Sequence, residues 1–221
     1  MSEVDEAKMR GQPVWQAMLR KYPDLEVCLP DIGRALELLI ETYRSGGKVL
    51  LCGNGGSASD SEHIVGELMK GFMKKRSLPP EERERFLRSD PLEGARLAEG
   101  LQGALPAISL VSQTALLTAY GNDVDAEMIF AQQVYGYGRP GDALIGLSTS
   151  GNSPNVIRAM QVAKTLGLRT VGLTGEGGGR MREACEVAIR VPWQSTPDVQ
   201  ERHLPIYHGL CICLEEEFFG S

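Results

Sequence analysis

Short apolar runs alternate with helical patterns along most of the chain. Four runs of strand length are each followed by Ser, Thr or Gly and then by a helical pattern, and they span 48–52, 107–111, 143–147 and 170–173. A fifth run, 187–191, precedes the last helical segment. Consecutive apolar positions are typical of strands buried on both faces, and strand–helix alternation predicts right-handed βαβ crossovers. The pattern therefore predicts an α/β fold of three layers, a parallel sheet flanked by helices.

A helical pattern also precedes the first strand. Residues 31–45 carry an apolar stripe at helical spacing, Asp31 is the expected N-cap, and Gly46 is the expected stop. An amphipathic piece at 14–19 is expected to pack beside this helix. We therefore expect residues 1–46 to form N-terminal helices.

The last helical segment is the longest. It is expected to run from Pro197 to about Phe219, with Thr196 as its N-cap and proline at the first helical position. Pro205 lies inside the segment and is expected to kink it, because proline lacks the N–H that a helix interior uses.

The segment 74–104 interrupts the alternation of strands and helices. It is rich in charge, includes Pro79-Pro80 and contains few apolar side chains. Acidic and basic residues balance there, which favours a solvated helical insertion over a nucleic-acid-binding patch. A chain of 221 residues is long enough for one core without staples, so we predict a single domain over 1–221 that carries this insertion.

Composition excludes several classes of function. The chain has 23 Lys and Arg against 29 Asp and Glu, a net charge of −6, so it has no overall basic field for nucleic acid or anionic membranes. No stretch reaches the ~20 apolar residues that cross a bilayer, and the first residues, MSEVDEAKMRGQ, lack the apolar segment of a signal peptide. Five cysteines at unrelated spacings predict a reduced protein in the cytoplasm.

The first strand is followed by the glycine-rich loop Gly53-Asn54-Gly55-Gly56-Ser57-Ala58. This loop satisfies the dinucleotide fingerprint G-x-G-x-x-G/A between a strand and a helix. The acidic residue that holds the ribose would fall within 71–75, and no acidic side chain occurs there. The Walker A signature Gly-Lys-Ser/Thr is also absent from the sequence. We therefore expect no nucleotide cofactor, and an oxidoreductase that uses one remains an alternative that rests on this loop alone.

The third strand is followed by a loop rich in hydroxyls and amides, Ser148-Thr149-Ser150-Gly151-Asn152-Ser153-Pro154-Asn155. Backbone N–H groups at a helix N-terminus, joined by Ser and Thr hydroxyls, bind a phosphate group without a metal or a lysine. Ordinary capping by Ser153 explains one serine but not four hydroxyls. The loop therefore predicts a site for a phosphomonoester.

Two helices supply the groups that could move protons. His63 and Glu67 are four residues apart, which puts them on one face of the helix that follows the glycine-rich loop. Gln200 and His208 lie two turns apart on the last helix and project to the same general side. For His63 and Glu67 the simpler alternative is a surface hydrogen bond. For Gln200 and His208 it is the packing face of a helix. His203 lies about 140° from His208 around that helix, so it is either structural or directed at a neighbouring subunit.

Four stretches together resemble the sugar isomerase (SIS) domain family, and within it the phosphoheptose isomerases: Gly53 to Ala58, Asn122-Asp123, Ser148 to Ser153 and Gln200 to His203. The resemblance extends from about residue 30 to the end and implies a single SIS domain of flavodoxin-like or Rossmann-like architecture. It implies that the phosphate is held by Ser148, Thr149, Ser150 and Ser153. It also implies that Asn54, Ser57 and Asp123 face the sugar hydroxyls, with Gly55, Gly56, Asn122 and Gln200 completing the substrate-binding set.

The same resemblance assigns the chemistry. It implies that Glu67 and His208 are the acid and base of an isomerisation through an enediol, with Gln200 orienting the substrate oxygens. Some members of the family bind zinc, and His63, Glu67, Gln200 and His208 would be its ligands here. A bound ion would restrict Glu67 as a free base, so the metal-assisted and metal-free mechanisms stay open as alternatives.

The expected activity is the conversion of sedoheptulose 7-phosphate to D-glycero-D-manno-heptose 7-phosphate or a closely related reaction. The resemblance further implies a homotetramer with active sites shared between subunits. The alternative is a noncatalytic SIS protein that senses a sugar phosphate or associates with a replication initiator. Such proteins generally lack the Glu and His pair, so the presence of Glu67 and His208 favours the enzyme.

Overall fold

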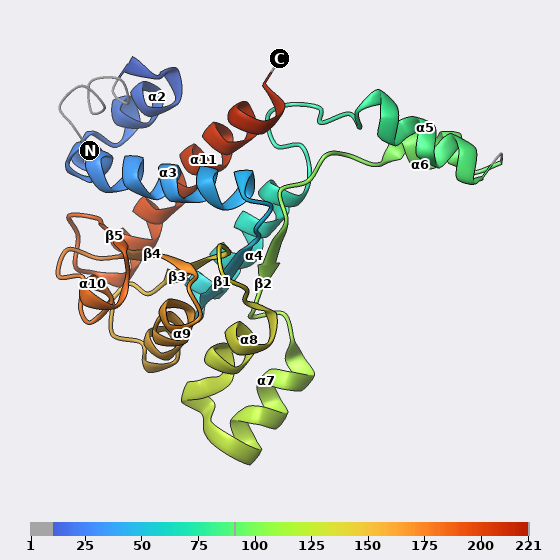
Figure 1. Ribbon diagram of the computed structural model, residues 1–221. Helices are drawn as coiled ribbons and strands as arrows, with labels where there is room; N and C mark the ends of the chain where they lie inside the picture. The colour runs from blue at the N-terminus through green and yellow to red at the C-terminus, as the bar shows by residue number, and fades with distance from the viewer. Residues whose placement is uncertain (1–10, 91, 221) are drawn as a thin grey trace.

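The structure is a computed structural model that describes residues 11–90 and 92–220. Its centre is a parallel sheet of β1 (Val49–Gly53), β2 (Ala107–Ser109), β3 (Ala143–Leu147), β4 (Arg169–Thr174) and β5 (Val187–Arg190). The strand order is β2-β1-β3-β4-β5, and every neighbouring pair is parallel (Figure 1). The predicted α/β fold with a parallel sheet flanked by helices is confirmed.

Helices cover both faces of the sheet, which makes three layers (Figure 1). Alternate residues of each strand point to opposite faces, so Val49 and Leu51 belong to one buried cluster and Leu50 and Cys52 to the other. The first cluster includes residues of α2 (Pro13–Lys21), α3 (Leu29–Arg44), α4 (Gly56–Met69) and α11 (Thr196–Phe219). The second includes residues of α8 (Ile129–Tyr137), α9 (Pro154–Thr165) and α10 (Met181–Ala184).

Shorter elements complete the fold. They are η1 (Pro23–Cys28), α7 (Thr114–Tyr120), η2 (Gly121–Asp125) and η3 (Ala126–Met128). Within the described part of the chain, no helix is both long and apolar enough to cross a membrane. The N-terminal residues on which the signal-peptide prediction rests fall partly in 1–10, outside the described residues.

Two helix starts differ from the sequence prediction. Helix α3 begins at Leu29 with Cys28 as its N-cap, because Pro30 is accommodated in the first turn. Asp31 is therefore not the cap, and its carboxylate pairs with Arg34 instead. Helix α11 begins at Thr196 with Ser195 as its N-cap, one residue earlier than predicted, and it continues through Pro205.

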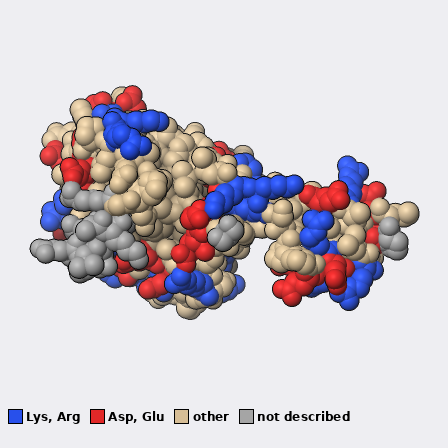
Figure 2. All heavy atoms as spheres, turned by 90° about the horizontal axis from the view of Figure 1, so that it is seen from above, with Lys and Arg blue, Asp and Glu red and all other residues tan. Residues whose placement is uncertain are grey.

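The charged segment folds as two helices, α5 (Pro80–Ser89) and α6 (Gly94–Gly100), that extend away from the sheet (Figure 1). Figure 2 shows them as a separate lobe that carries both signs of charge. The two ends of the segment are joined at its base, where Ser77 and Gln102 form an antiparallel bridge and the N–H of Gly103 donates to the carbonyl of Arg76 at 2.8 Å. These two contacts hold the base of the lobe together close to the C-terminal end of α4.

Candidate active site

The carboxyl ends of β1 and β3 lie side by side at the centre of the sheet. From β1 the chain crosses to β2 on one side, and from β3 it proceeds through β4 and β5 on the other. In open α/β sheets, ligands bind at such a switch in strand order. The loops after β1 and β3 line a cavity of about 320 Å³ with the start of α11, formed by Asn54, Gly55, Gly56, Ser57, Leu147, Ser148, Thr149, Ser153, Thr196 and Gln200.

The glycine-rich loop shapes the first wall of this cavity. Gly55 is the N-cap of α4 and has a φ of 56°, a backbone conformation that favours glycine. A Cβ on Gly56 would lie 2.4 Å from Nε2 of Gln200. The absence of a side chain at this position therefore lets the amide of Gln200 reach the loop.

The second wall presents hydroxyls at the N-terminus of α9. The hydroxyl oxygens of Ser148 and Ser153 lie 2.9 Å apart. Ser153 occupies the N-cap position, as expected, but its side chain makes no capping hydrogen bond. Pro154 has no N–H, and the N–H of Val156 donates to the side-chain oxygen of Asn155 at 3.0 Å, so this terminus offers a ligand its hydroxyls and the positive end of the helix dipole. Ser150, by contrast, is exposed, accepts a bond from the N–H of Asn152 and is not among the lining residues.

A reciprocal amide pair joins the two loops. The amide nitrogen of Asn54 donates to the side-chain oxygen of Asn155 at 2.9 Å, and that of Asn155 donates back at 3.0 Å. Asn155 had no predicted role, although its place in the polar loop was visible in the sequence. The pair fixes the two walls of the cavity against each other.

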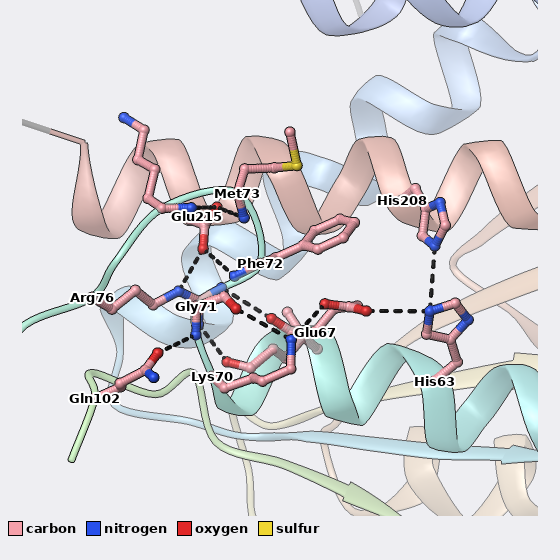
Figure 3. A network of polar contacts seen from close by, with 12 residues as sticks. His63, Glu67, Lys70, Gly71, Phe72, Met73, Arg76, Gln102, His208 and Glu215 are labelled. Carbon is pink, nitrogen blue, oxygen red and sulfur yellow. Dashed lines mark hydrogen bonds and ion pairs between the residues drawn. The ribbon is translucent and has the colours of Figure 1, made fainter. Parts of the chain in front are cut away.

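A chain of polar contacts joins α4 to α11 (Figure 3). Nε2 of His63 lies 3.2 Å from Oε1 of Glu67 and 3.5 Å from Nε2 of His208. The side chain of Glu67 is 12% exposed and that of His63 is 43% exposed, so the cluster is sheltered at one side and open at the other. Glu67 and His208 therefore both contact His63 within a single subunit. These are three of the four predicted acid–base and metal-binding residues, and Gln200 is the fourth.

Electrostatics favour a neutral His208. Burial lowers the pKa of His208, the charge of His63 lowers it further, and Glu67 opposes the shift. A neutral imidazole has one donor and one acceptor nitrogen, which is what a group needs to pass a proton between two oxygens.

Comparisons with known proteins agree with this geometry. The model of the SIS domain family matches residues 26–91 and 94–175. A phosphoheptose isomerase of Rhodospirillum rubrum is 40% identical over 189 residues, which are 86% of this chain and 87% of that protein. One from Burkholderia pseudomallei is 39% identical over 211 residues, 96% of this chain and 92% of that protein. The chain belongs to the phosphoheptose isomerase family of SIS domain proteins.

Solved structures support the same assignment. The structure of a phosphoheptose isomerase from Francisella tularensis matches with a TM-score of 0.73 at 29% identity, covering 98% of this chain and 100% of that chain. The structure of the phosphoheptose isomerase from Neisseria gonorrhoeae matches with a TM-score of 0.72 at 31% identity, covering 91% of this chain and 94% of that chain. The family resemblance predicted from the four sequence stretches is confirmed.

Two predicted substrate contacts of the phosphoheptose isomerase pattern lie outside the cavity. Asn122 and Asp123 are exposed in η2, and the amide of Asn122 donates to the carboxylate of Asp123 at 2.8 Å. Neither residue lines the cavity between the two loops. The assignment of Asp123 to the sugar hydroxyls and of Asn122 to the substrate-binding set stays a prediction.

The predicted zinc ligands fit an ion in part. In a tetrahedral zinc site with bonds of ~2.0–2.1 Å, neighbouring donor atoms are about 3.3 Å apart. The distances from Nε2 of His63 to Oε1 of Glu67 and to Nε2 of His208, 3.2 and 3.5 Å, are close to this value. The amide of Gln200, the fourth predicted donor, lies against Gly56. Across residues 11–90 and 92–220, no group of three or more His, Cys, Asp and Glu side chains is arranged to hold a metal ion. Zinc therefore stays a prediction.

A buried ion pair that the sequence did not reveal supports the end of α4. Nη2 and Nη1 of Arg76 donate to the carbonyls of Glu67 and Leu68 at 3.0 and 2.6 Å, which satisfies the free carbonyls of the helix C-terminus (Figure 3). Its Nε donates to Glu215 of α11 at 2.8 Å. The carboxylate of Glu215 also accepts three backbone bonds, from Phe72, Met73 and Lys74. The backbone of Glu67 is thereby tied to the helix that carries His208.

The surroundings of Glu215 keep it ionised. Burial opposes ionisation, but the N–H groups of Phe72 and Met73 and the guanidinium of Arg76 outweigh it and lower the pKa of Glu215. Arg76 and Glu215 are both fully buried as side chains, and the guanidinium of Arg76 also lies 4.7 Å from the ring centroid of Phe219.

His203 is structural within its own subunit. It is fully buried, and among the residues that the structure describes no group meets the geometry of a hydrogen bond to either ring nitrogen. Burial lowers the pKa of His203 to about 4, although the backbone of Thr174 is near enough to oppose the shift. The helical period left two alternatives for His203, a structural role or a side chain directed at a neighbouring subunit. The second is therefore wrong.

Proposed function

We propose that this protein interconverts sedoheptulose 7-phosphate and D-glycero-D-manno-heptose 7-phosphate. The observation that carries the proposal is the contact of Glu67 and His208 with the same nitrogen of His63. Membership of the phosphoheptose isomerase family supports it, since the relatives named above are phosphoheptose isomerases. The assignment to an aldose–ketose isomerase follows from that family.

The phosphate group is held in the cavity between the two loops. The hydroxyls of Ser148 and Ser153, with Thr149 beside them, surround the N-terminus of α9. The partial positive charge of the helix terminus attracts an anion. In this proposal Ser150 contributes through its loop, and Asn54, Ser57 and Asp123 face the sugar hydroxyls.

The proton transfers take place over α4 and α11. Glu67 removes a proton from C1 of the ketose, and the electrons of the C–H bond form the C1–C2 double bond of an enediol. O2 gains a proton from His208 as the carbonyl is lost. Glu67 then returns its proton to C2, while O1 gives a proton to His208 and becomes the aldehyde oxygen. Gln200 orients the oxygens, and no proton is gained or lost overall.

The spacing of the two parts of the site suits a long sugar. Gln200 lines the phosphate cavity and His208 lies at the acid–base cluster, and the two residues are eight positions apart on α11, a rise of about 12 Å. An open-chain ketose of seven carbons is of similar length between its phosphate and C1. The spacing therefore favours a phosphate at the far end of a long chain over a triose phosphate.

Zinc is proposed as a cofactor of the same cluster. His63, Glu67 and His208 would hold the ion with Gln200 as the fourth predicted ligand, and a bound ion would polarise the substrate carbonyl. The two donor separations at His63 support this proposal. Elemental analysis of protein purified without chelator should find zinc, and chelation should lower activity; metal-free protein with unchanged activity would favour the metal-free mechanism.

A homotetramer in the cytoplasm is proposed as the working form. An apolar groove of about 490 Å³ runs beside His208, between α2 and α11, and a second subunit there would add to the site. The five cysteines are free thiols, and this supports a reducing compartment. A monomeric mass in solution would contradict the shared site.

The direct test is to incubate the protein with sedoheptulose 7-phosphate in D₂O and follow the sugar by NMR. The proposal predicts an aldose product that carries deuterium at C2, because the transferred proton can exchange with solvent on the base. Binding of the sugar phosphate without turnover would contradict it and would favour the noncatalytic sensor. A set of other ketose phosphates in the same assay defines the substrate range.

A further inference from the structure

The hydroxyl of Tyr207 lies between two residues of α4. It donates a hydrogen bond to Oδ1 of Asp60 at 3.1 Å, and it lies 3.1 Å from Nδ1 of His63. Tyr207 is buried, and its ring packs edge-on against the rings of His63 and His208 at centroid distances of 5.5 and 5.1 Å. Tyr207 therefore reaches the acid–base cluster from behind, at the ring nitrogen of His63 that faces away from Glu67.

The protons in this chain of contacts can be assigned. The hydroxyl of Tyr207 is a phenol, which has one proton to donate. That proton is used in the bond to Asp60. The phenolic oxygen can then only accept from His63, and this requires the proton of a neutral His63 ring to be on Nδ1.

We propose that Tyr207, anchored by Asp60, is a positioning residue that holds His63 in the tautomer with its proton on Nδ1. The inference rests on the isomerase function proposed above, with Glu67 as the base. It leaves Nε2 of His63 without a proton at the point where Glu67 and His208 meet.

This tautomer matters to the base. With no proton on Nε2, His63 does not donate to the carboxylate of Glu67, which keeps its full capacity to accept a proton. A proton taken from the substrate then arrives between Oε1 of Glu67 and Nε2 of His63, 3.2 Å apart, and both atoms can share it. The opposite tautomer would occupy that space with its own proton and weaken the base. Binding of a metal ion through Nε2 would require the same tautomer.

The test is the tautomer of the neutral histidine rings, read by nitrogen-15 NMR at alkaline pH. The chain has three histidines, so a His63→Gln variant identifies the signals of His63. In the unsubstituted protein we expect Nδ1 protonated and Nε2 unprotonated. Tyr207→Phe should release the ring to a mixture of tautomers. Asp60→Ala should go further and move the proton to Nε2, because the phenol is then free to donate to Nδ1.

Kinetics give the second readout. Tyr207→Phe and Asp60→Ala should each lower kcat by about 10- to 100-fold with KM little changed, since the phosphate cavity is untouched. The matched control is Tyr43→Phe, because the buried phenol oxygen of Tyr43, unlike that of Tyr207, has no hydrogen-bond partner among the described residues. This control should change neither kcat nor the histidine signals.

Two results would overturn the proposal: a proton on Nε2 of His63 in the unsubstituted protein, or a Tyr207→Phe variant with the original kcat and tautomer. The NMR measurement needs no turnover. A protein without isomerase activity would contradict the proposed function, while the tautomer result would still decide whether Tyr207 positions His63.

Discussion

Glu67 and His208 approach the same atom, Nε2 of His63, at 3.2 and 3.5 Å. The two residues lie on helices that are more than 100 positions apart in the chain, and α4 and α11 are both packed on one face of the sheet. A carboxylate and an imidazole that meet at a third side chain form one proton-transfer unit instead of two independent groups.

The hydroxyls of the second loop should control substrate affinity. Ser148→Ala and Ser153→Ala each remove one group of the pair that is 2.9 Å apart at the N-terminus of α9. Loss of one hydrogen bond to a charged phosphate should weaken binding by about tenfold or more, as a higher KM with kcat little changed. Thr165→Ala is the control, because its hydroxyl bonds to Gln161 near the other end of α9. An unchanged KM in both serine variants would show that this loop does not bind the phosphate.

A side chain at Gly56 should lower activity. Gly56→Ala places a Cβ 2.4 Å from the amide nitrogen of Gln200, so Gln200 must move out of the cavity. We expect a lower kcat/KM with a folded protein. Gly66→Ala on the same helix meets nothing within 4 Å and should keep activity and gain about 0.5–1 kcal/mol of stability. Equal kinetics in the two variants would show that Gln200 has no role.

The Arg76–Glu215 pair should matter for stability. Glu215→Ala leaves the guanidinium of Arg76 buried without its partner, which should lower the free energy of unfolding by about 3–5 kcal/mol. The exposed pair of Arg88 and Glu84 provides the control, and Glu84→Ala should change the free energy of unfolding by less than ~0.5 kcal/mol. Denaturant titration of both variants measures the difference. A Glu215→Ala variant as stable as the original protein would contradict the role of the pair.

His203 should make the protein sensitive to acid. Its pKa is lowered in the fold to about 4, against a reference value of 6.5, so the unfolded chain binds a proton that the folded chain does not. The contribution is complete above pH 6.5 and is lost as the pH falls toward 4. At pH 5 the loss should be about 2 kcal/mol, at 1.36 kcal/mol per pH unit.

The matched variant is His203→Leu, which places an apolar side chain of similar size there and removes two nitrogens that have no hydrogen-bond partner among the described residues. Denaturant titrations at pH 7.5 and pH 5 should show a smaller loss of stability in this variant than in the original protein. The same loss in both proteins would assign the acid sensitivity to other groups.

The sequence predicted the fold well because the strands are buried on both faces. Continuous apolar runs such as 143–147 have one simple solution, a central parallel strand, and β3 has these bounds in the structure. Helix starts were less predictable. Asp31 satisfies the rule for an N-cap, but Pro30 allows α3 to begin two residues earlier.

Part of the site could not be predicted from sequence. The spacing of His63 and Glu67 fixed their shared face, since residues four apart are neighbours on a helix. The partners of Arg76 and Tyr207 depend on how α4 and α11 are rotated against each other, and no local pattern specifies that rotation. The same holds for the two asparagines that join the loops, which are about 100 residues apart.

The central claim is that Glu67 is the base of an isomerisation whose substrate is held elsewhere. The most direct measurement is the turnover of sedoheptulose 7-phosphate by Glu67→Gln, together with its binding measured by calorimetry. The account predicts that kcat falls by about 100-fold or more while the dissociation constant changes little, because the phosphate cavity does not include Glu67. A Glu67→Gln variant that turns over at the original rate would contradict it.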